Sequence, residues 1–228
     1  MESVGTSGRR EREKAKRRED ILRAAREVFF SKGAGRATID DVAARAEVSK
    51  GTIYLYFESK EVILAHFVLE GLDILSSRLQ TAYAPHKDLP ADERVRRLAH
   101  AYLKFSKSHH QYFRLMTAFD RGQFRERVPA PLYQEVAERS LASLRWVEQA
   151  LEQGRASGQL VVDDSWRMAG VLWASLNGVL LLLDHPLRQE ILGVPLNLLF
   201  DSTLELLLHG LNAEPAVRRS SQVKKGAQ

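Results

Sequence analysis

The sequence contains no cysteine, and only 7 of its 228 residues are proline. The absence of cysteine excludes disulfide scaffolds, thiolate zinc sites, iron–sulfur clusters and cysteine nucleophiles. Long hydrophobic runs are also missing, because the longest charge-free stretch, residues 168–183, has 16 residues, whereas a membrane-spanning helix needs about 20. No apolar segment follows the basic N-terminus, so a secretory signal is not expected. We therefore expect a cytoplasmic protein with no membrane partner and with one large or two modest domains.

Positive charge is concentrated at the two ends of the chain. The net charge of +5 divides into +4 over residues 1–60 (14 Lys/Arg against 10 Asp/Glu), −2 over residues 61–212 (16 against 18) and +3 over residues 213–228 (4 against 1). Residues 9–18 alone hold seven basic side chains against two glutamates. This asymmetry indicates a polyanionic partner for the N-terminal region. The alternative is a soluble chain with two frayed, charged ends.

The first sixty residues carry helical patterns with short connections. An apolar stripe with spacings of three and four residues runs up to Gly33 and comprises Ile21, Ala24, Ala25, Val28 and Phe29. Hydroxyl residues stand at the predicted N-caps of the next three helices, at Thr38, Ser49 and Ser59. Asp41, three residues after Thr38, forms a near relative of the capping box. The sequence therefore predicts an all-helical region with a compact helix-turn-helix corner.

The outer face of the helix that begins after Ser49 is unusual for a solvated surface. It combines a lysine, a glycine, a threonine, a leucine and two tyrosines, which are Lys50, Gly51, Thr52, Leu55, Tyr54 and Tyr56. Glycine permits a close backbone approach, hydroxyl groups donate to phosphate, and lysine reaches phosphates or base edges. This combination favours a DNA-binding surface.

Residues 29–62, which read FFSKGAGRATIDDVAARAEVSKGTIYLYFESKEV, resemble the DNA-binding domain of the TetR family of transcriptional regulators. The matching pattern is F-x3-G, then T-x3-(I/V)-A, then V-S-x-G-T-(I/L)-Y-x-Y-F-x-S-K-E. The resemblance implies an all-α fold, with an N-terminal three-helix helix-turn-helix domain and a C-terminal helical domain for ligand binding and dimerisation. Glu47 departs from the family, which often has glycine there, so we expect it to occupy the turn at some strain cost.

The resemblance also implies a set of DNA contacts. The start of the third helix is expected to enter the major groove, the tyrosines to hold the DNA backbone, and Thr38 and Lys60 to contact phosphates. For Asp40, two interpretations remain open: its carboxylate accepts from a cytosine amine, or it favours the N-terminus of its own helix. The implied DNA-binding residues are Thr38, Asp40, Ser49, Lys50, Gly51, Thr52, Tyr54, Tyr56 and Lys60.

The predicted organisation has four parts. These are a flexible basic arm over residues 1–17, a helix-turn-helix domain over 18–78 with its motif at about 38–57, an effector-binding and dimerisation domain over 79–212, and a disordered basic tail over 213–228. We expect the arm to be able to reach the minor groove beside the site, as the arms of other helix-turn-helix proteins do.

Two segments near the C-terminus, residues 168–183 and 196–211, are apolar around most of the helix circumference. A helix that is apolar all round is buried on more than one side, so we expect a second copy of the chain to cover this pair. The spacing of Gly170, Ala174 and Gly178 invites close helix contact, and TetR-like proteins dimerise through two C-terminal helices per subunit. The alternative is a monomeric core.

Aromatic and polar side chains of the C-terminal two-thirds are candidates for an effector pocket, although aromatics at helical spacing are also typical of an ordinary core. The candidates are Tyr102, Phe105, Tyr112, Phe113, Met116, Trp146, Trp173 and Asn177. Asn177 is the most suggestive of them because it interrupts an apolar helix, where it can equally hydrogen-bond across a dimer.

The sequence lacks the zinc-protease, nucleophile-elbow and phosphate-loop motifs, so we expect no enzyme activity, metal or cofactor. We predict a homodimeric, nucleoid-associated DNA-binding regulator. Such regulators act most often as repressors, so we expect this protein to bind a pseudo-palindromic operator, repress transcription and be released by a small lipophilic effector. The alternatives are an activator, a helical small-molecule-binding protein that does not bind DNA, and an enzyme built on a helical bundle.

Overall fold

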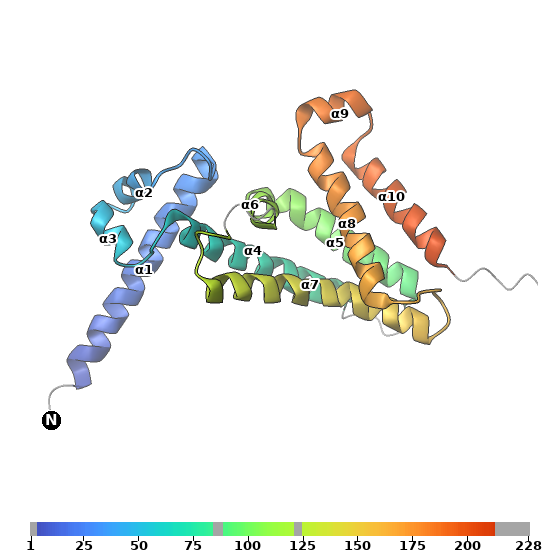
Figure 1. The fold of residues 1–228 in the computed structure, drawn as a ribbon, viewed down its shortest axis with the longest axis horizontal. Helices are drawn as coiled ribbons and strands as arrows, with labels where there is room; N and C mark the ends of the chain where they lie inside the picture. The colour runs from blue at the N-terminus through green and yellow to red at the C-terminus, as the bar shows by residue number, and fades with distance from the viewer. Residues whose placement is uncertain (1–3, 84–88, 121–124, 213–228) are drawn as a thin grey trace, which may run out of the picture. The chain divides into compact units, whose positions relative to one another are not determined.

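The computed structural model describes residues 4–83, 89–120 and 125–212. Within these ranges the regular elements are α-helices, accompanied by an isolated antiparallel bridge between Leu160 and Asn212 (Figure 1). The helices are α1 (Val4–Lys32), α2 (Ile39–Arg45), α3 (Lys50–Tyr54), α4 (Lys60–Tyr83), α5 (Ala91–Ser108), α6 (His110–Asp120), α7 (Ala130–Ala156), α8 (Ser165–Leu183), α9 (Pro186–Leu192) and α10 (Leu196–Leu211). The predicted all-α fold is confirmed.

The chain forms two compact units that interleave in sequence. The N-terminal unit combines residues up to 76 with residues 105–141, and the C-terminal unit combines residues 77–104 with those from 142 onward. This division differs from the single boundary predicted at residue 78, because α6 packs on α4. At Gly71 of α4, an added Cβ would lie 3.0 Å from Cβ of Tyr112 and 3.2 Å from Sδ of Met116. The absent side chain therefore lets α6 approach α4 closely.

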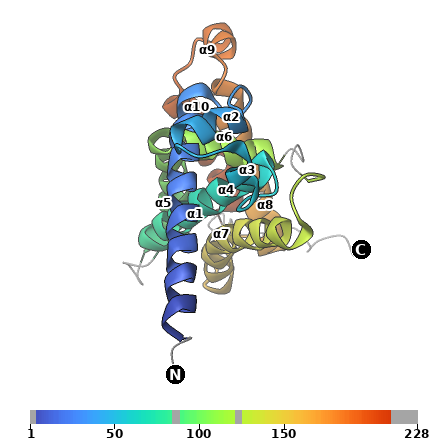
Figure 2. The same cartoon turned by 90° about the vertical axis from the view of Figure 1, so that its left-hand side faces the viewer.

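The N-terminal segment is helical, which corrects the prediction of a flexible arm. Residues 4–17 form the first turns of α1, and Figures 1 and 2 both show these turns extending beyond α2 and α3. Arg, Lys, Glu and Ala are strong helix formers, and Arg9 pairs with Glu13 one turn later at 2.8 Å. Residues 1–3 of the predicted arm and the predicted tail, 213–228, lie outside the described residues.

The core of the N-terminal unit includes the predicted apolar stripe of residues 21–29 and apolar residues of α2, α4 and the α3 region. Ile21, Phe29, Val42, Ile53 and Phe57 are fully or almost fully buried, as is Phe67 of α4. The rings of Phe29 and Phe67 meet edge to face, with their centroids 6.3 Å apart. This core fixes α2 and α3 against α1 and α4.

In the C-terminal unit, α8 and α10 pack against each other and run antiparallel, joined by α9 (Figure 1). On its inner face, α10 buries Phe200, Leu204, Leu208 and Leu211. Asp164 caps α8, since its carboxylate accepts from the Arg167 N–H at 2.9 Å. In the part of the chain described, no single helix is long and apolar enough to cross a membrane, although α8 and α9 together, bent at the break between them, pass the same test of length and composition.

Candidate nucleic-acid interface

A tight turn sets α3 against α2. The backbone of Glu47 is left-handed, with φ of 54°, as expected for a side-chain-bearing residue at a position where the family often has glycine. The N–H of Val48 donates to the carbonyl oxygen of Ala43 at 3.0 Å, and this bond closes the turn. The two helices of the motif are therefore held by local backbone geometry as well as by the core.

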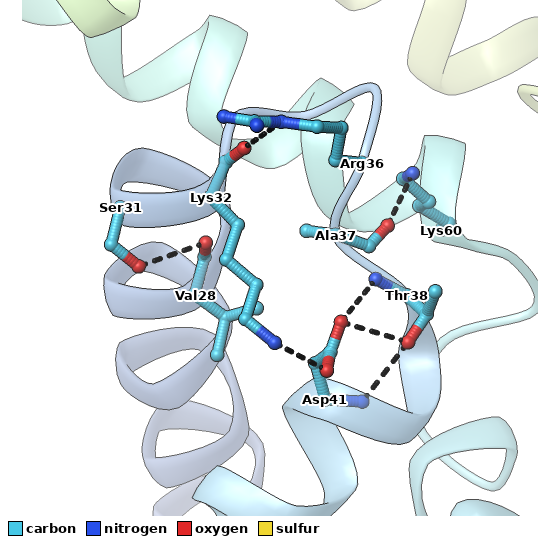
Figure 3. Close-up of polar contacts among 8 residues, drawn as sticks. All are labelled: Val28, Ser31, Lys32, Arg36, Ala37, Thr38, Asp41 and Lys60. Carbon is cyan, nitrogen blue, oxygen red and sulfur yellow. Dashed lines mark hydrogen bonds and ion pairs between the residues drawn. The ribbon is translucent and has the colours of Figure 1, made fainter.

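A complete capping box starts α2 (Figure 3). The hydroxyl of Thr38 accepts from the Asp41 N–H at 3.2 Å, and the carboxylate of Asp41 accepts from both the N–H and the hydroxyl of Thr38 at 2.9 Å. Lys32 of α1 donates to the other carboxylate oxygen at 2.6 Å. The hydrogen bond from Lys32, followed by those from Thr38, lowers the pKa of Asp41 to about 2. A phosphate contact by the Thr38 hydroxyl would thus replace its bond to Asp41.

Lys60, the first residue of α4, reaches back toward α2 (Figure 3). Its ammonium donates to the carbonyl oxygen of Ala37 at 2.6 Å and lies 5.7 Å from the centroid of the Phe29 ring. Because an ammonium carries three donors, this bond leaves Lys60 able to donate to a phosphate as well.

Local hydrogen bonds also organise the start of α3. Ser49 is the N-cap, since its hydroxyl accepts from the Thr52 N–H at 3.0 Å, and the two hydroxyls lie 2.8 Å apart. Gly51 is exposed, and an added Cβ there would meet only the Ser49 hydroxyl, at 3.7 Å. Packing within the chain therefore does not require a glycine at this position.

Lys50 and Asp40 form an ion pair across the helix-turn-helix turn. The ammonium nitrogen of Lys50 lies 2.9 Å from a carboxylate oxygen of Asp40. This hydrogen bond raises the pKa of Lys50 above its ordinary value. The pair is a contact for Asp40 that neither interpretation from the sequence included.

At the C-cap of α3 the exposed surface also includes an apolar residue that is not among the contacts implied by the resemblance. Leu55 is 79% exposed and follows the exposed Tyr54, whereas Tyr56 is half-buried. The sequence signal for Leu55 is its position four residues after Gly51, which puts both residues on the same helical face. An exposed aliphatic side chain on such a surface can contact the methyl group of thymine.

The candidate effector residues are divided between the two units. In the C-terminal unit the hydroxyl of Tyr102 donates to the side-chain oxygen of Asn177 at 3.0 Å, which joins α5 to α8. Trp146 lies beside Tyr83, with ring centroids 5.1 Å apart, and Trp173 is exposed on α8. The other four candidates belong to the N-terminal unit, where Phe105, Tyr112 and Phe113 are buried and Met116 is half-buried.

A polar network joins α1, α4 and α6 within the N-terminal unit. Glu70 accepts from Arg26 at 2.5 Å and from the hydroxyl of Tyr112 at 2.8 Å. Burial, and then the bond to Glu70, raise the pKa of Tyr112 to about 12. The Nε of Arg26 is buried and makes no hydrogen bond among the described residues.

Comparison with known proteins connects this geometry to a family. Residues 21–67 match the family described as bacterial regulatory proteins, tetR family. The chain is 30% identical over 145 residues to the uncharacterised HTH-type transcriptional regulator YhgD of Bacillus subtilis. The aligned residues make up 63% of this chain and 72% of YhgD. The chain is 35% identical over 77 residues to the HTH-type transcriptional repressor BepR of Brucella suis, which covers 34% of this chain and 32% of BepR.

Solved structures share the fold. A regulatory protein in the tetR family from Rhodococcus RHA1 aligns with a TM-score of 0.66 at 20% identity, over 87% of this chain and 98% of that one. The regulator FadR from Bacillus subtilis, in complex with stearoyl-CoA, aligns with a TM-score of 0.60 at 22% identity, over 84% and 98%. The family match contains the capping box, the turn at Glu47 and the whole of α3. The chain belongs to the TetR family of helix-turn-helix transcriptional regulators.

Proposed function

We propose that this chain is a repressor that binds a pseudo-palindromic operator as a homodimer and leaves it when a lipophilic effector binds. The observation that carries the proposal is the exposed, capped surface of α2 and α3, where Lys50, Gly51 and Tyr54 stand together. In this proposal DNA binding resides in residues 18–78 and effector binding in residues 79–212, and the protein acts in the cytoplasm on the nucleoid.

DNA contacts divide into those that position the protein and those that specify sequence. Thr38, Tyr54, Tyr56 and Lys60 contact phosphates in this proposal. Ser49, Lys50, Gly51 and Thr52 lie in the major groove, with Asp40 beside them. The caps and the core hold the groove-facing side chains on a rigid frame, which supports base recognition rather than loose phosphate binding.

The basic turns of α1 extend the contact with DNA. Residues 9–18 carry seven basic side chains, and all are exposed except the half-buried Arg18. Since these turns are helical, we propose that they follow the phosphate backbone beside the operator. In this proposal the helical turns make an electrostatic contact with phosphates, whereas the sequence led us to expect a flexible arm that reaches the minor groove.

The dimer forms in this proposal through the outer faces of α8 and α10. Both helices expose large apolar side chains, which are Trp166, Val171, Trp173 and Leu182 on α8 and Leu198 and Leu206 on α10. Burying a large apolar side chain stabilises an assembly by about 1.5–3 kcal/mol, so covering this face favours association strongly. Operator binding favours a two-fold dimer whose recognition helices lie about 34–36 Å apart, one turn of DNA.

The effector binds the C-terminal unit in this proposal and favours a spacing of the recognition helices that does not fit the operator. By linkage, such a ligand lowers DNA affinity by the same factor by which DNA lowers ligand affinity. The aromatic candidates that lie in this unit, Tyr102, Trp146 and Trp173, together with the Tyr102–Asn177 hydrogen bond, support a ligand that is mostly apolar with a polar group. The stearoyl-CoA complex of the Bacillus subtilis neighbour supports an acyl chain as the first ligand class to test.

A genomic-fragment selection with the purified full-length protein at about 0.15 M salt tests the proposal, because loose phosphate binding is weakened there. We expect one or a few pseudo-palindromes to be enriched, and acyl-CoA to release them. Enrichment of nothing above random sequence would exclude DNA binding by the free protein and favour a ligand-binding protein without DNA activity. An operator placed upstream of a promoter, with transcription rising on binding, would instead identify an activator.

A further inference from the structure

The following proposal rests on the proposed function, that α2 and α3 bind DNA. We propose that Asp40 and Lys50 together recognise one G·C base pair in each half of the operator. Lys50 donates to guanine while Asp40 accepts from the paired cytosine. Asp40 also positions the Lys50 ammonium, so the pair sets sequence preference at that one position.

The pair lies across the turn of the motif rather than within one helix. Asp40 stands in the first turn of α2, Lys50 is the first residue of α3, and their charged atoms are 2.9 Å apart. The side chain of Lys50 is 50% exposed and that of Asp40 is 67% exposed. Both charged groups are therefore accessible from solvent at the start of the recognition helix.

The side chains nearest to Lys50 in α3 carry no charge, and Arg45 at the end of α2 is already paired. Lys50 is the sole charged residue in the sequence of α3, KGTIY. The hydroxyls of Ser49 and Thr52 lie within hydrogen-bonding distance of each other, and Ile53 is buried. At the end of α2, Arg45 is paired with Glu27 of α1.

The edge of a G·C pair complements this arrangement. In the major groove, guanine presents the acceptors N7 and O6 beside the N4 amino donor of cytosine. An ammonium and a carboxylate 2.9 Å apart present a donor directly beside an acceptor. Of the three ammonium donors, one serves Asp40 and two remain for O6 and N7. An A·T pair presents an adenine amino donor between two acceptors and adds a thymine methyl, so the same pair of charges fits it less well.

The Asp40 carboxylate also disfavours a phosphate as the partner of Lys50. Its negative charge offsets the attraction of Lys50 for the backbone and is itself repelled by phosphates. Exposed ion pairs contribute little to folding stability, so stability does not account for the contact. The hydrogen bond to Asp40 raises the pKa of Lys50 and so favours the protonated ammonium that donates to guanine.

Selection from randomised duplexes with four full-length proteins tests the proposal. These are the wild type, Asp40→Asn, Lys50→Gln and the control Glu205→Gln, which breaks an ion pair with Arg96 in the C-terminal unit. We expect the wild type and the control to enrich the same palindrome, with G·C at one position of each half. Asp40→Asn and Lys50→Gln should keep its spacing and other positions but lose about fivefold or more of the preference at that position.

Chemical substitution of the DNA tests the same contact without relying on a variant. Replacing the guanine at that position by 7-deazaguanine, which lacks the N7 acceptor, should weaken binding by the wild type and leave binding by Lys50→Gln unchanged. Unchanged preferences in both variants, or a selected A·T pair at the position that they alter, would overturn the reading of G·C by this pair while leaving DNA binding intact. Enrichment of no sequence by any of the four proteins would overturn DNA binding itself, and this proposal with it.

Discussion

The ammonium of Lys60 is hydrogen-bonded to the carbonyl oxygen of Ala37 at 2.6 Å, which ties the first residue of α4 to the residue before the N-cap of α2. We therefore expect Lys60→Met to lower the free energy of unfolding by about 1.5–3 kcal/mol, the range for hydrogen bonds to charged groups. Urea denaturation measures this loss. Lys14→Met, on the exposed turns of α1, is the control and should change stability little.

The same Lys60 variant separates a phosphate contact from a purely structural role. If Lys60 also contacts a phosphate, the slope of log affinity against log salt should decrease by about 0.9 for each phosphate that the variant no longer neutralises. An unchanged slope, together with the loss of stability, would assign Lys60 to the protein frame alone.

Asp41 gives the N-terminal unit a defined acid sensitivity. The folded state lowers the pKa of its carboxyl from 3.8 to about 2, so the stabilisation is fully present above about pH 4 and is lost as the pH falls toward 2. We expect Asp41→Asn to be less stable than the wild type at pH 5–7, and this difference to shrink between pH 4 and 2. Thermal unfolding across that range checks it, and a difference that stays constant down to pH 2 would contradict the assignment.

The network at Glu70 predicts unequal effects of its members. Tyr112→Phe removes one hydrogen bond and should cost about 1 kcal/mol. Glu70→Ala should cost more, because it removes the acceptor of both Tyr112 and Arg26, whose Nε is already buried without a hydrogen bond among the described residues. The double variant should lose less than the sum of the two single losses, since both remove the same bond. Additive losses in chemical denaturation would show that the hydrogen bond between Tyr112 and Glu70 contributes no net stability.

Gly154 of α7 marks a close approach in the C-terminal unit. An added Cβ would lie 2.6 Å from Cβ of Ala91 and from Cδ1 of Leu160, and the Ala91 atom cannot move without the backbone of α5. We expect Gly154→Ala to destabilise the protein by about 1–3 kcal/mol, despite the higher helix propensity of alanine. A rise in the thermal midpoint would contradict this.

The proposed dimer face predicts a specific dissociating variant. Leu206 on α10 is 73% exposed, so Leu206→Glu should leave the subunit folded while raising the dimer dissociation constant about tenfold or more. Leu141→Glu, at a 47% exposed position on α7, is the matched control and should remain dimeric. Sedimentation across a concentration series distinguishes them, and dissociation of the Leu141 variant alone would place the interface elsewhere.

Features with short sequence separation were predictable. Thr38, Ser49 and Ser59 each accept a hydrogen bond from the N–H three residues later, and this chemistry is visible in the sequence because both partners are neighbours. The left-handed turn at Glu47 was expected from the resemblance, because TetR-family proteins often have glycine at that position. The first turns of α1 were predicted wrongly because they bury no apolar stripe, and periodicity gives no signal for a helix that is polar all round.

Contacts between distant residues were not predictable. Lys60 and Ala37 are separated by 23 positions, and Glu70 and Tyr112 by 42; these pairs exist only once the helices have packed. Aromatic spacing likewise could not separate core from surface, since Phe105 is completely buried whereas Trp173 is exposed. The effector site therefore remains a proposal, while the recognition helix follows from its local motif.

The hydroxyl caps on α2, α3 and α4 have a thermodynamic consequence for recognition. Because each cap bonds within the protein, the helices that meet DNA are ordered before it arrives, and little conformational entropy is lost on association. Binding should therefore show a small heat-capacity change, without the large negative value of a segment that folds on its target. Encounter rates should follow electrostatic steering rather than a folding step.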